Sequence, residues 1–335
     1  MERELRPGET IVVRSAAEIL ATLDSEGTTE GMPFMPEMLP FLGRRFVVSK
    51  RAQKVCDTIK YTGSRRLPNT VLLEDLRCDG ASHDGCQAEC RFYWKEAWLR
   101  RPTPGESSEP SPGPAEEMRA LEARLAPNTR RVREVEGAPE KVYRCQATDL
   151  LLCTTRHRLW QPRQYFRELT CGNVGLGRFL RVLPRVLVWE TMRKLGLLPE
   201  VHLVGTRTAP GDDEPLDLQP GEWVEVKLRE DLRKALSPRG TNRGLWFDWE
   251  MERYCGGRFR VRQRITRFID DRNCRMVVLK TDAVTLESVT CTGNYSARRW
   301  FCPRAVYPFW RESWLRRADG PPPERGNETR RSADG

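Results

Sequence analysis

The sequence lacks several features that would define a function class. Its 335 residues contain no run of about 18 apolar residues, so we expect no transmembrane helix. The opening decapeptide MERELRPGET has no apolar core, so we expect no secretory signal peptide and a cytoplasmic location. A phosphate-binding glycine loop, an HExxH helix and a nucleophile elbow are missing, and Gly172–Gly177 (GNVGLG) follows no convincing strand. None of these standard catalytic motifs is therefore present in the sequence.

Histidine is also scarce, whereas cysteine is not. The chain has three histidines and eleven cysteines. His157 lies among arginines and is expected in a solvated turn, and His202 suggests no role. An odd number of cysteines in a cytoplasmic protein favours metal binding or reactive thiols over a disulfide framework.

The charge balance is basic. A formal net charge of +10 favours anionic partners such as nucleic acid, phospholipid or phosphate-bearing substrates. Acidic residues are interspersed almost everywhere, however, and no long basic block occurs. An arginine-rich surface without such a partner therefore remains an equal alternative.

An internal repeat organises the chain. At an offset of 213 residues, and of 216 after three inserted residues, glycines, aromatics and cysteines match in register over about 90 residues. Examples are Gly8-Glu9 with Gly221-Glu222, Phe34 with Phe247, Cys78 with Cys291, Cys86 with Cys302, and Trp98-Leu99-Arg100-Arg101 with Trp314-Leu315-Arg316-Arg317. Two homologous domains follow from this match.

Each repeat is expected to be a small, mostly β domain in an α+β protein. Thr10–Arg14 is an opening strand, and Ser15 with Glu18 forms a capping box before a short helix. Four to five short strands within about 70 residues predict a curled sheet or barrel. The opening phrase Gly-Glu-Trp-Val-Glu-Val resembles the first strand of SH3-like barrels, which implies two SH3-like domains.

A Trp-rich helix is predicted to close each repeat, over Phe92–Arg100 and Phe309–Arg317. Trp94 and Trp98 are spaced i, i+4 and would share one helical face. That face either packs into the core of its own domain, which is the favoured interpretation, or forms an aromatic binding platform.

The composition predicts six segments. They are an N-terminal repeat (1–101), a linker (102–115), a helical middle segment (116–208), a second linker (209–220), a C-terminal repeat (221–317) and a disordered tail (318–335). In the middle segment, Tyr143–Thr154 and Pro162–Leu169 are predicted to be helical. The apolar stretch 178–197, kinked at Pro184, is either a helix packed between the repeats or a peripheral membrane contact.

The cysteines of the first repeat are the candidates for a metal site. Cys78-x4-His83-x2-Cys86-x3-Cys90 has the short spacing of a metal site, and thiolates with an imidazole suit a zinc ion or an iron–sulfur cluster. Cys56 and Cys145 are candidates for a further ligand. Buried structural thiols and a redox-active or nucleophilic cysteine remain alternatives.

The second repeat holds only half of this set. It keeps Cys291 and Cys302, but Ile269 and Val306 stand where the first repeat has Cys56 and Cys90. Some acidic residues match in both repeats: Asp57 with Asp270, Glu37 with Glu250, and Glu74 with Glu287. Because only one repeat keeps the cysteine set, these carboxylates suit roles in the fold better than catalysis.

The phrases GMPFMPEMLPFLGRRFVV, LRCDGASHDGCQAEC and FCPRAVYPFWRESWL resemble those of an uncharacterised bacterial protein family. The resemblance covers nearly all of both repeats. It implies a bacterial, cytoplasmic protein and transfers no catalytic residue.

The leading hypothesis is a metal-stabilised binding or accessory protein, because duplicated small barrels usually form a composite binding surface. Its partner would be a protein, an anionic polymer or a membrane-bound assembly. The first alternative is a metalloenzyme or redox protein that uses Cys78, Cys86 and Cys90. The second is a nucleic-acid-binding protein, whose affinity would fall steeply with salt.

Overall fold

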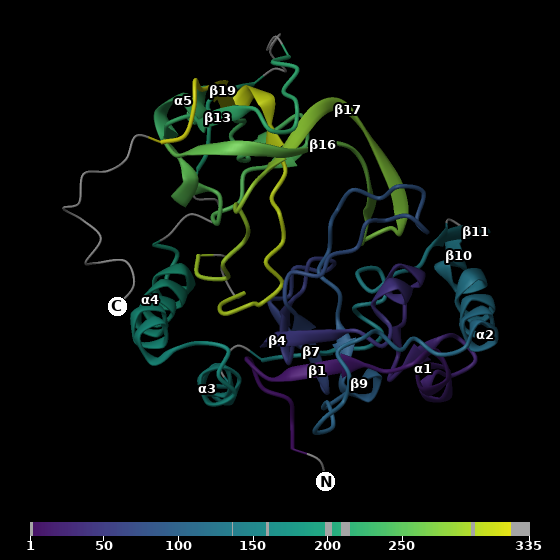
Figure 1. Cartoon of the computed structure of the whole chain (residues 1–335). Coiled ribbons are helices and arrows are strands. Elements are labelled where there is room, and N and C mark those ends of the chain that lie inside the picture. Colours follow the sequence, from purple (N-terminus) through teal and green to yellow (C-terminus); the bar gives the residue numbers. More distant parts are fainter. Residues whose placement is uncertain are drawn as a thin grey trace. The chain divides into compact units, whose positions relative to one another are not determined.

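The computed structural model describes residues 3–135, 137–158, 161–197, 203–208, 215–295 and 299–322. It contains helices and several antiparallel sheets, which confirms an α+β protein (Figure 1). The chain divides into two compact units. Unit 1 comprises the described parts of Met1–Asn173, Arg267–Val277 and Phe301–Arg304, and unit 2 comprises those of Val174–Thr266, Val278–Trp300 and Ala305–Gly335.

The N-terminal repeat forms a five-stranded antiparallel sheet. Its elements are β1 (Thr10–Val13), α1 (Ala16–Thr22), β2 (Thr28–Thr29), β3 (Met32–Pro33), η1 (Pro36–Phe41), β4 (Arg45–Arg51), β5 (Lys54–Cys56), β6 (Ser64–Arg66), β7 (Thr70–Leu73), β8 (Trp94–Lys95), η2 (Glu96–Trp98) and β9 (Leu99–Arg100). Five strands lie in the order β8-β7-β4-β1-β9. The two edge strands β8 and β9 are joined by the single 3-10 turn η2, so the chain passes directly from one edge of the sheet to the other.

The C-terminal repeat has the same sequence of elements. They are β13 (Trp223–Val226), α5 (Arg229–Ala235), β14 (Thr241–Asn242), β15 (Leu245–Trp246), η4 (Glu252–Tyr254), β16 (Arg258–Asp270), β17 (Arg275–Leu286), β18 (Trp310–Arg311), η5 (Glu312–Trp314) and β19 (Leu315–Arg317). The sheet order is β18-β17-β16-β13-β19, and η5 again joins the two edge strands. No closed barrel is found in the described part of either repeat.

The correspondence extends to individual hydrogen bonds. Gly8 N donates to Val48 O at 2.8 Å, and Gly221 N donates to Val261 O at 2.7 Å. All four residues obey the offset of 213. The repeat therefore reproduces the backbone pairing as well as the sequence pattern.

The capping box of α1 is confirmed. The Ser15 backbone N donates to Glu18 Oε2 at 3.0 Å, and the Glu18 backbone N donates to Ser15 Oγ at 3.5 Å. Two of the orphan donors at the start of the helix are satisfied in this way.

The predicted Trp-rich helices over Phe92–Arg100 and Phe309–Arg317 are wrong. In each repeat this segment is a strand, a three-residue 3-10 turn and another strand. The i, i+4 spacing of the tryptophans misled the prediction. A strand followed by a tight turn also brings both rings to the same side, and neighbouring strands then hold the backbone in place.

The tryptophans themselves belong to the cores. Trp94, Trp98, Trp310 and Trp314 are all fully buried, so the described rings form no exposed platform. Phe34 meets the Trp98 ring edge-to-face, with 5.1 Å between ring centroids, and the equivalent pair in the second repeat is separated by 5.3 Å. Such contacts add to the stabilisation that burial of the rings provides.

The middle segment is not purely helical. It contains α2 (Ala115–Leu125), η3 (Ala126–Thr129), β10 (Arg130–Val135), β11 (Ala138–Tyr143), β12 (Thr155–Arg156), α3 (Arg163–Thr170) and α4 (Leu176–Lys194). The predicted helix over Tyr143–Thr154 is wrong, because Tyr143 ends a hairpin strand and turns follow it. Thr148 Oγ1 accepts from Cys145 N at 2.8 Å and stabilises the first of these turns.

Helix α4 occupies most of the apolar stretch 178–197 and contains Pro184. Phe179, Val182 and Val186 are buried, whereas Leu180 and Leu187 are exposed. Among the described helices, none is long and apolar enough to cross a membrane.

Some predicted segments lie wholly or partly outside the described residues. These are His202, most of the second linker (209–214) and most of the tail (323–335).

Candidate functional site

The Cys-rich loop of the first repeat lies in unit 1 between β7 and β8. Its two ends meet where Cys78 N donates to Cys90 O at 2.9 Å. Its tip turns at Gly80, whose carbonyl accepts from His83 N at 2.9 Å and from Gly85 N at 3.0 Å. The loop is therefore a compact, internally bonded structure.

His83 is held by two acceptors. Its Nδ1 lies 2.6 Å from Glu37 Oε1, and its Nε2 lies 2.8 Å from the Arg144 carbonyl oxygen. Because both partners are acceptors, both ring nitrogens donate and the imidazole is protonated. Burial acts to lower the pKa of His83, but Glu37 outweighs it and the pKa is raised. In this arrangement His83 has no lone pair to offer a metal.

Glu37 has an equivalent in the second repeat that performs the same task. Glu37 Oε1 accepts from Ser82 N at 3.0 Å. Glu250 Oε1 accepts from Tyr295 N at 2.7 Å, and Tyr295 lies in the corresponding loop of the second repeat, between Cys291 and Cys302. Each buried carboxylate thus ties its own repeat's cysteine loop to the domain, which supports the fold role that sequence analysis predicted.

Three of the predicted ligand thiols lie close enough to influence one another. Burial raises the pKa of Cys78, and the Cys90 and Cys145 thiols raise it further. Burial also raises the pKa of Cys90 to about 11 and that of Cys145 to about 12. Among the described residues, no three His, Cys, Asp or Glu side chains converge in the geometry of a metal site.

A second group of thiols surrounds a buried arginine in the same unit. Cys302 Sγ accepts from Cys56 N at 3.2 Å. The Arg304 guanidinium, 7% exposed, donates to Thr58 Oγ1 at 2.9 Å and lies 3.8 Å from Cys56 Sγ. Burial acts to lower the pKa of Arg304, but negative charge on Tyr93 and on the sulfurs of Cys56, Cys90 and Cys302 would outweigh it and raise the pKa.

Sequence analysis missed Cys302 as a member of this group, because the repeat assigned it to the second domain. The alignment of the two repeats contained a signal that could have identified Cys302. Cys302 matches Cys86, and Cys56 matches Ile269. The structure pairs them reciprocally: Cys86 Sγ accepts from Ile269 N at 3.3 Å, just as Cys302 Sγ accepts from Cys56 N.

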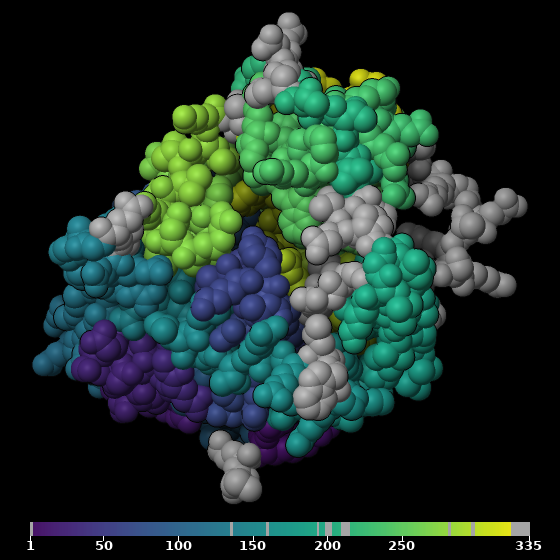
Figure 2. Space-filling model, turned by 180° about the vertical axis from the view of Figure 1, so that it is seen from behind, coloured from purple at the N-terminus to yellow at the C-terminus, as the bar shows by residue number. Residues whose placement is uncertain are grey.

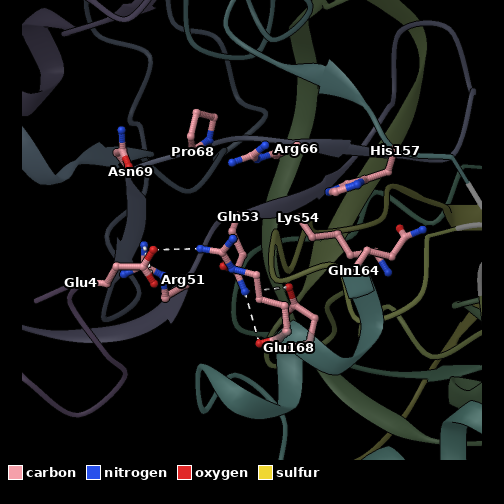
Figure 3. Close-up of a pocket in the computed structure, with 11 residues that line it drawn as sticks. Glu4, Arg51, Gln53, Lys54, Arg66, Pro68, Asn69, His157, Gln164 and Glu168 are labelled. Carbon is pink, nitrogen blue, oxygen red and sulfur yellow. Dashed lines mark hydrogen bonds and ion pairs between the residues drawn. The ribbon is translucent and has the colours of Figure 1, made fainter. Parts of the chain in front are cut away.

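A polar pocket lies elsewhere in unit 1 (Figure 3). Its volume is about 480 Å³ including its open mouth, and its lining comes from β4, β5, β6, α3 and nearby loops. Lys54 and Gln53 stand in the middle of the view, Arg51 to one side, and His157 and Gln164 to the other. The space-filling view shows a blue surface region of the N-terminal repeat next to teal residues (Figure 2).

The electrostatics of this pocket are unusual. Burial lowers the pKa of Lys54 to about 8, although the charge of Glu168 acts in the opposite direction. Burial together with the charges of Lys54 and Arg66 lowers the pKa of His157 to about 4. His157 is thus a neutral side chain in a pocket, and the prediction of a solvated turn is wrong. Its local sequence did not reveal that β12 pairs with β6 next to it.

Comparison of the chain with protein-family models, with curated proteins and with solved structures finds no match in any of the three. The resemblance to a bacterial family stays a prediction. Function is therefore inferred from the residues and their geometry.

Proposed function

We propose that the chain is a binding or accessory protein made of two SH3-like repeats, and that thiolates of unit 1 hold a zinc ion or an iron–sulfur cluster. The sheet order supports the SH3-like assignment, because the first strand lies between the second and the last, and a 3-10 turn joins the last two strands. Binding rather than catalysis is an argument from fold analogy, since duplicated small β domains usually build composite binding surfaces.

The main observation behind the metal proposal is the buried guanidinium of Arg304. A buried cation needs a counter-charge, and among the described residues no carboxylate forms an ion pair with Arg304. Cys56, Cys90 and Cys302 lie around it instead. Protonated thiols cannot supply negative charge, but metal-bound thiolates can, because the metal keeps them deprotonated.

Backbone donors support the same group. Sγ of Cys86 and Sγ of Cys302 each accept an N–H bond, at 3.3 and 3.2 Å. Amide bonds to sulfur are a usual second shell of metal-bound thiolates. We therefore propose Cys56, Cys86, Cys90 and Cys302 as the ligands. In the described residues these thiols do not converge in the geometry of a metal site, so they would have to draw together around the metal. Cys78 and Cys145, which are near enough to Cys90 to influence its electrostatics, are alternative ligands, and His83 supports the loop from outside the proposed centre.

The test is elemental analysis with an absorption spectrum on protein purified without oxygen. The wild type is expected to retain about one zinc ion or one cluster per chain. Cys90→Ser and Cys302→Ser should both lose it. Cys153→Ser is the matched control, because Cys153 is also buried in unit 1 but bonds only to the carbonyls of Asp149 and Leu150.

Folded wild-type protein without metal would contradict the proposal, and so would full retention in Cys302→Ser. Zinc without colour would favour a structural centre. Iron with labile sulfide would move the interpretation toward a redox protein.

A further inference from the structure

The residues that line the polar pocket of unit 1 carry four buried polar atoms that have no hydrogen-bond partner in the described chain. They are Nζ of Lys54, Nε of Arg51 and the Oε1 atoms of Gln53 and Gln164. Lys54 and Arg51 are each 1% exposed, Gln53 is 6% exposed and Gln164 is 5% exposed. A buried polar group without a partner costs about 1–3 kcal/mol, and a charged group costs more. Four such atoms on the residues around one cavity indicate that something else satisfies them.

The orientation of both amides is fixed by their nitrogens. Gln164 Nε2 donates to the Arg158 carbonyl at 2.8 Å. Gln53 Nε2 donates to Cys171 Sγ at 3.2 Å and lies 3.5 Å from Glu168 Oε1. Both Oε1 atoms are therefore acceptors that await a donor. A ligand of this pocket must present N–H or O–H groups to them.

The positively charged side chains of the pocket indicate that the other end of the ligand is an anion. Arg51 and Arg167 have carboxylate partners, at 2.7 Å to Glu96 and 2.8 Å to Glu4 respectively. Lys54 and Arg66 form no ion pair within the described residues. The first lies deep in the pocket and the second at its exposed edge. Two cations without ion-pair partners suit a doubly charged anion better than a single carboxylate.

The rest of the wall suits a small polar molecule. The Lys54 ammonium lies 4.1 Å from the centre of the Tyr165 ring, which fixes its direction without satisfying its donors. Glu168 acts on Lys54 through space, while its Oε2 accepts from Asn173 at 2.7 Å. The cavity itself has a volume of about 90 Å³, and the rest of the space opens to solvent. The two Oε1 acceptors, rather than the size of the cavity, call for an organic part that carries donors.

We propose that this pocket binds a small phosphate ester that carries hydroxyl or amino donors. Its phosphate meets Lys54 and Arg66, and its donors meet the Oε1 atoms of Gln53 and Gln164. The middle segment completes the site, because α3 supplies Gln164 and Glu168. The second repeat has Arg267 and Leu279 where the first has Lys54 and Arg66, so we infer one such site per chain.

The experiment is calorimetric titration of the full chain, with ribose 5-phosphate, inorganic phosphate, ribose and succinate as probes. Ribose 5-phosphate should bind most tightly, inorganic phosphate more weakly, and ribose and succinate not detectably. Lys54→Met should weaken ribose 5-phosphate binding roughly 10- to 100-fold. Arg66→Gln should weaken it by about tenfold without affecting folding, because Arg66 is exposed.

Lys95→Met is the matched control. Lys95 is also 1% exposed, but its Nζ is bonded to Glu30 at 2.7 Å and to the Pro68 carbonyl at 3.1 Å. This variant should lose stability and keep its affinity for ribose 5-phosphate. Equal binding of succinate, equal affinity in Lys54→Met and Arg66→Gln, or no binding of either phosphate probe to folded protein would overturn the proposal.

Discussion

Glu37 and Glu250 offer the sharpest test of how each repeat holds its own cysteine loop in place. Each buried carboxylate binds its own cysteine loop, so replacing either with glutamine keeps the volume and removes the charge. We predict that Glu37→Gln and Glu250→Gln destabilise the protein to a similar extent.

The magnitude follows from the bonds each residue makes. Glu37 accepts from Ser82 N at 3.0 Å and from His83 at 2.6 Å, and glutamine would leave the protonated imidazole without its counter-charge. Glu250 accepts from Thr292 N at 2.9 Å, from Thr292 Oγ1 at 2.7 Å and from Tyr295 N at 2.7 Å. Loss of charge assistance costs about 1 kcal/mol per bond, so Glu250→Gln, which loses it in three bonds, should lose roughly 3 kcal/mol. Glu37→Gln should lose about 2 kcal/mol for its two bonds and about 1 kcal/mol more for the imidazolium left without a counter-charge, which is the same total.

Differential scanning calorimetry measures this loss. For units of this size, 1 kcal/mol corresponds to about 2–4 °C, so each variant should lower the melting temperature of the unit that contains it by roughly 6–12 °C. Glu122→Gln, on the exposed face of α2, is the control and should change stability by less than about 0.5 kcal/mol. If either loop variant melts like the control, its carboxylate is not a tether. Metal content should be the same in Glu37→Gln as in the wild type, because His83 lies outside the proposed centre.

Three further predictions concern the N-terminal repeat. Ser15→Ala removes the capping box of α1 and should cost about 1 kcal/mol in urea denaturation, whereas an unchanged midpoint would mean that the cap is dispensable. Burial acts to raise the pKa of Glu30, but the bond from Lys95 outweighs it and lowers the pKa below 4.5. The stability advantage of the wild type over Glu30→Gln should therefore be present at neutral pH and vanish as pH falls through that pKa, and a constant difference would refute the pairing. Gly80 and Gly85 both have positive φ, but only at Gly80 would an added Cβ overlap the backbone of the loop, so Gly80→Ala should destabilise more than Gly85→Ala, and equal losses would argue against the crowding.

Much of the fold could be predicted because the repeat preserved its spacing. Opening strands, first helices and short hairpins recur at an offset of 213, and α1 carried its own capping signal in Ser15 and Glu18. Local patterns of this kind depend only on residues that are close in sequence, so they can be recognised in a single sequence.

The closing segments could not be predicted from spacing alone. An i, i+4 pair such as Trp94 and Trp98 fits one face of a helix, but it also fits a strand that ends in a 3-10 turn. The deciding factor is the pairing of β8 with β7 and of β9 with β1, which is a long-range property.

The candidate sites also divide into a part that local sequence predicts and a part that depends on long-range contacts. The loop Cys78–Cys90 was visible as a motif, whereas the place of Cys302 beside Cys56 depends on contacts between residues 246 positions apart. The pocket was invisible for the same reason, because Lys54 and Gln164 come from separate segments with no shared pattern.

The central claim is a metal-bearing thiolate centre in unit 1, and native mass spectrometry of oxygen-free wild-type protein tests it most directly. The account predicts a folded chain heavier than its sequence by one zinc ion or one cluster, and a return to the sequence mass when acid unfolds the protein. A folded chain whose native mass already equals the sequence mass would contradict the claim, and would leave Arg304 buried among neutral thiols.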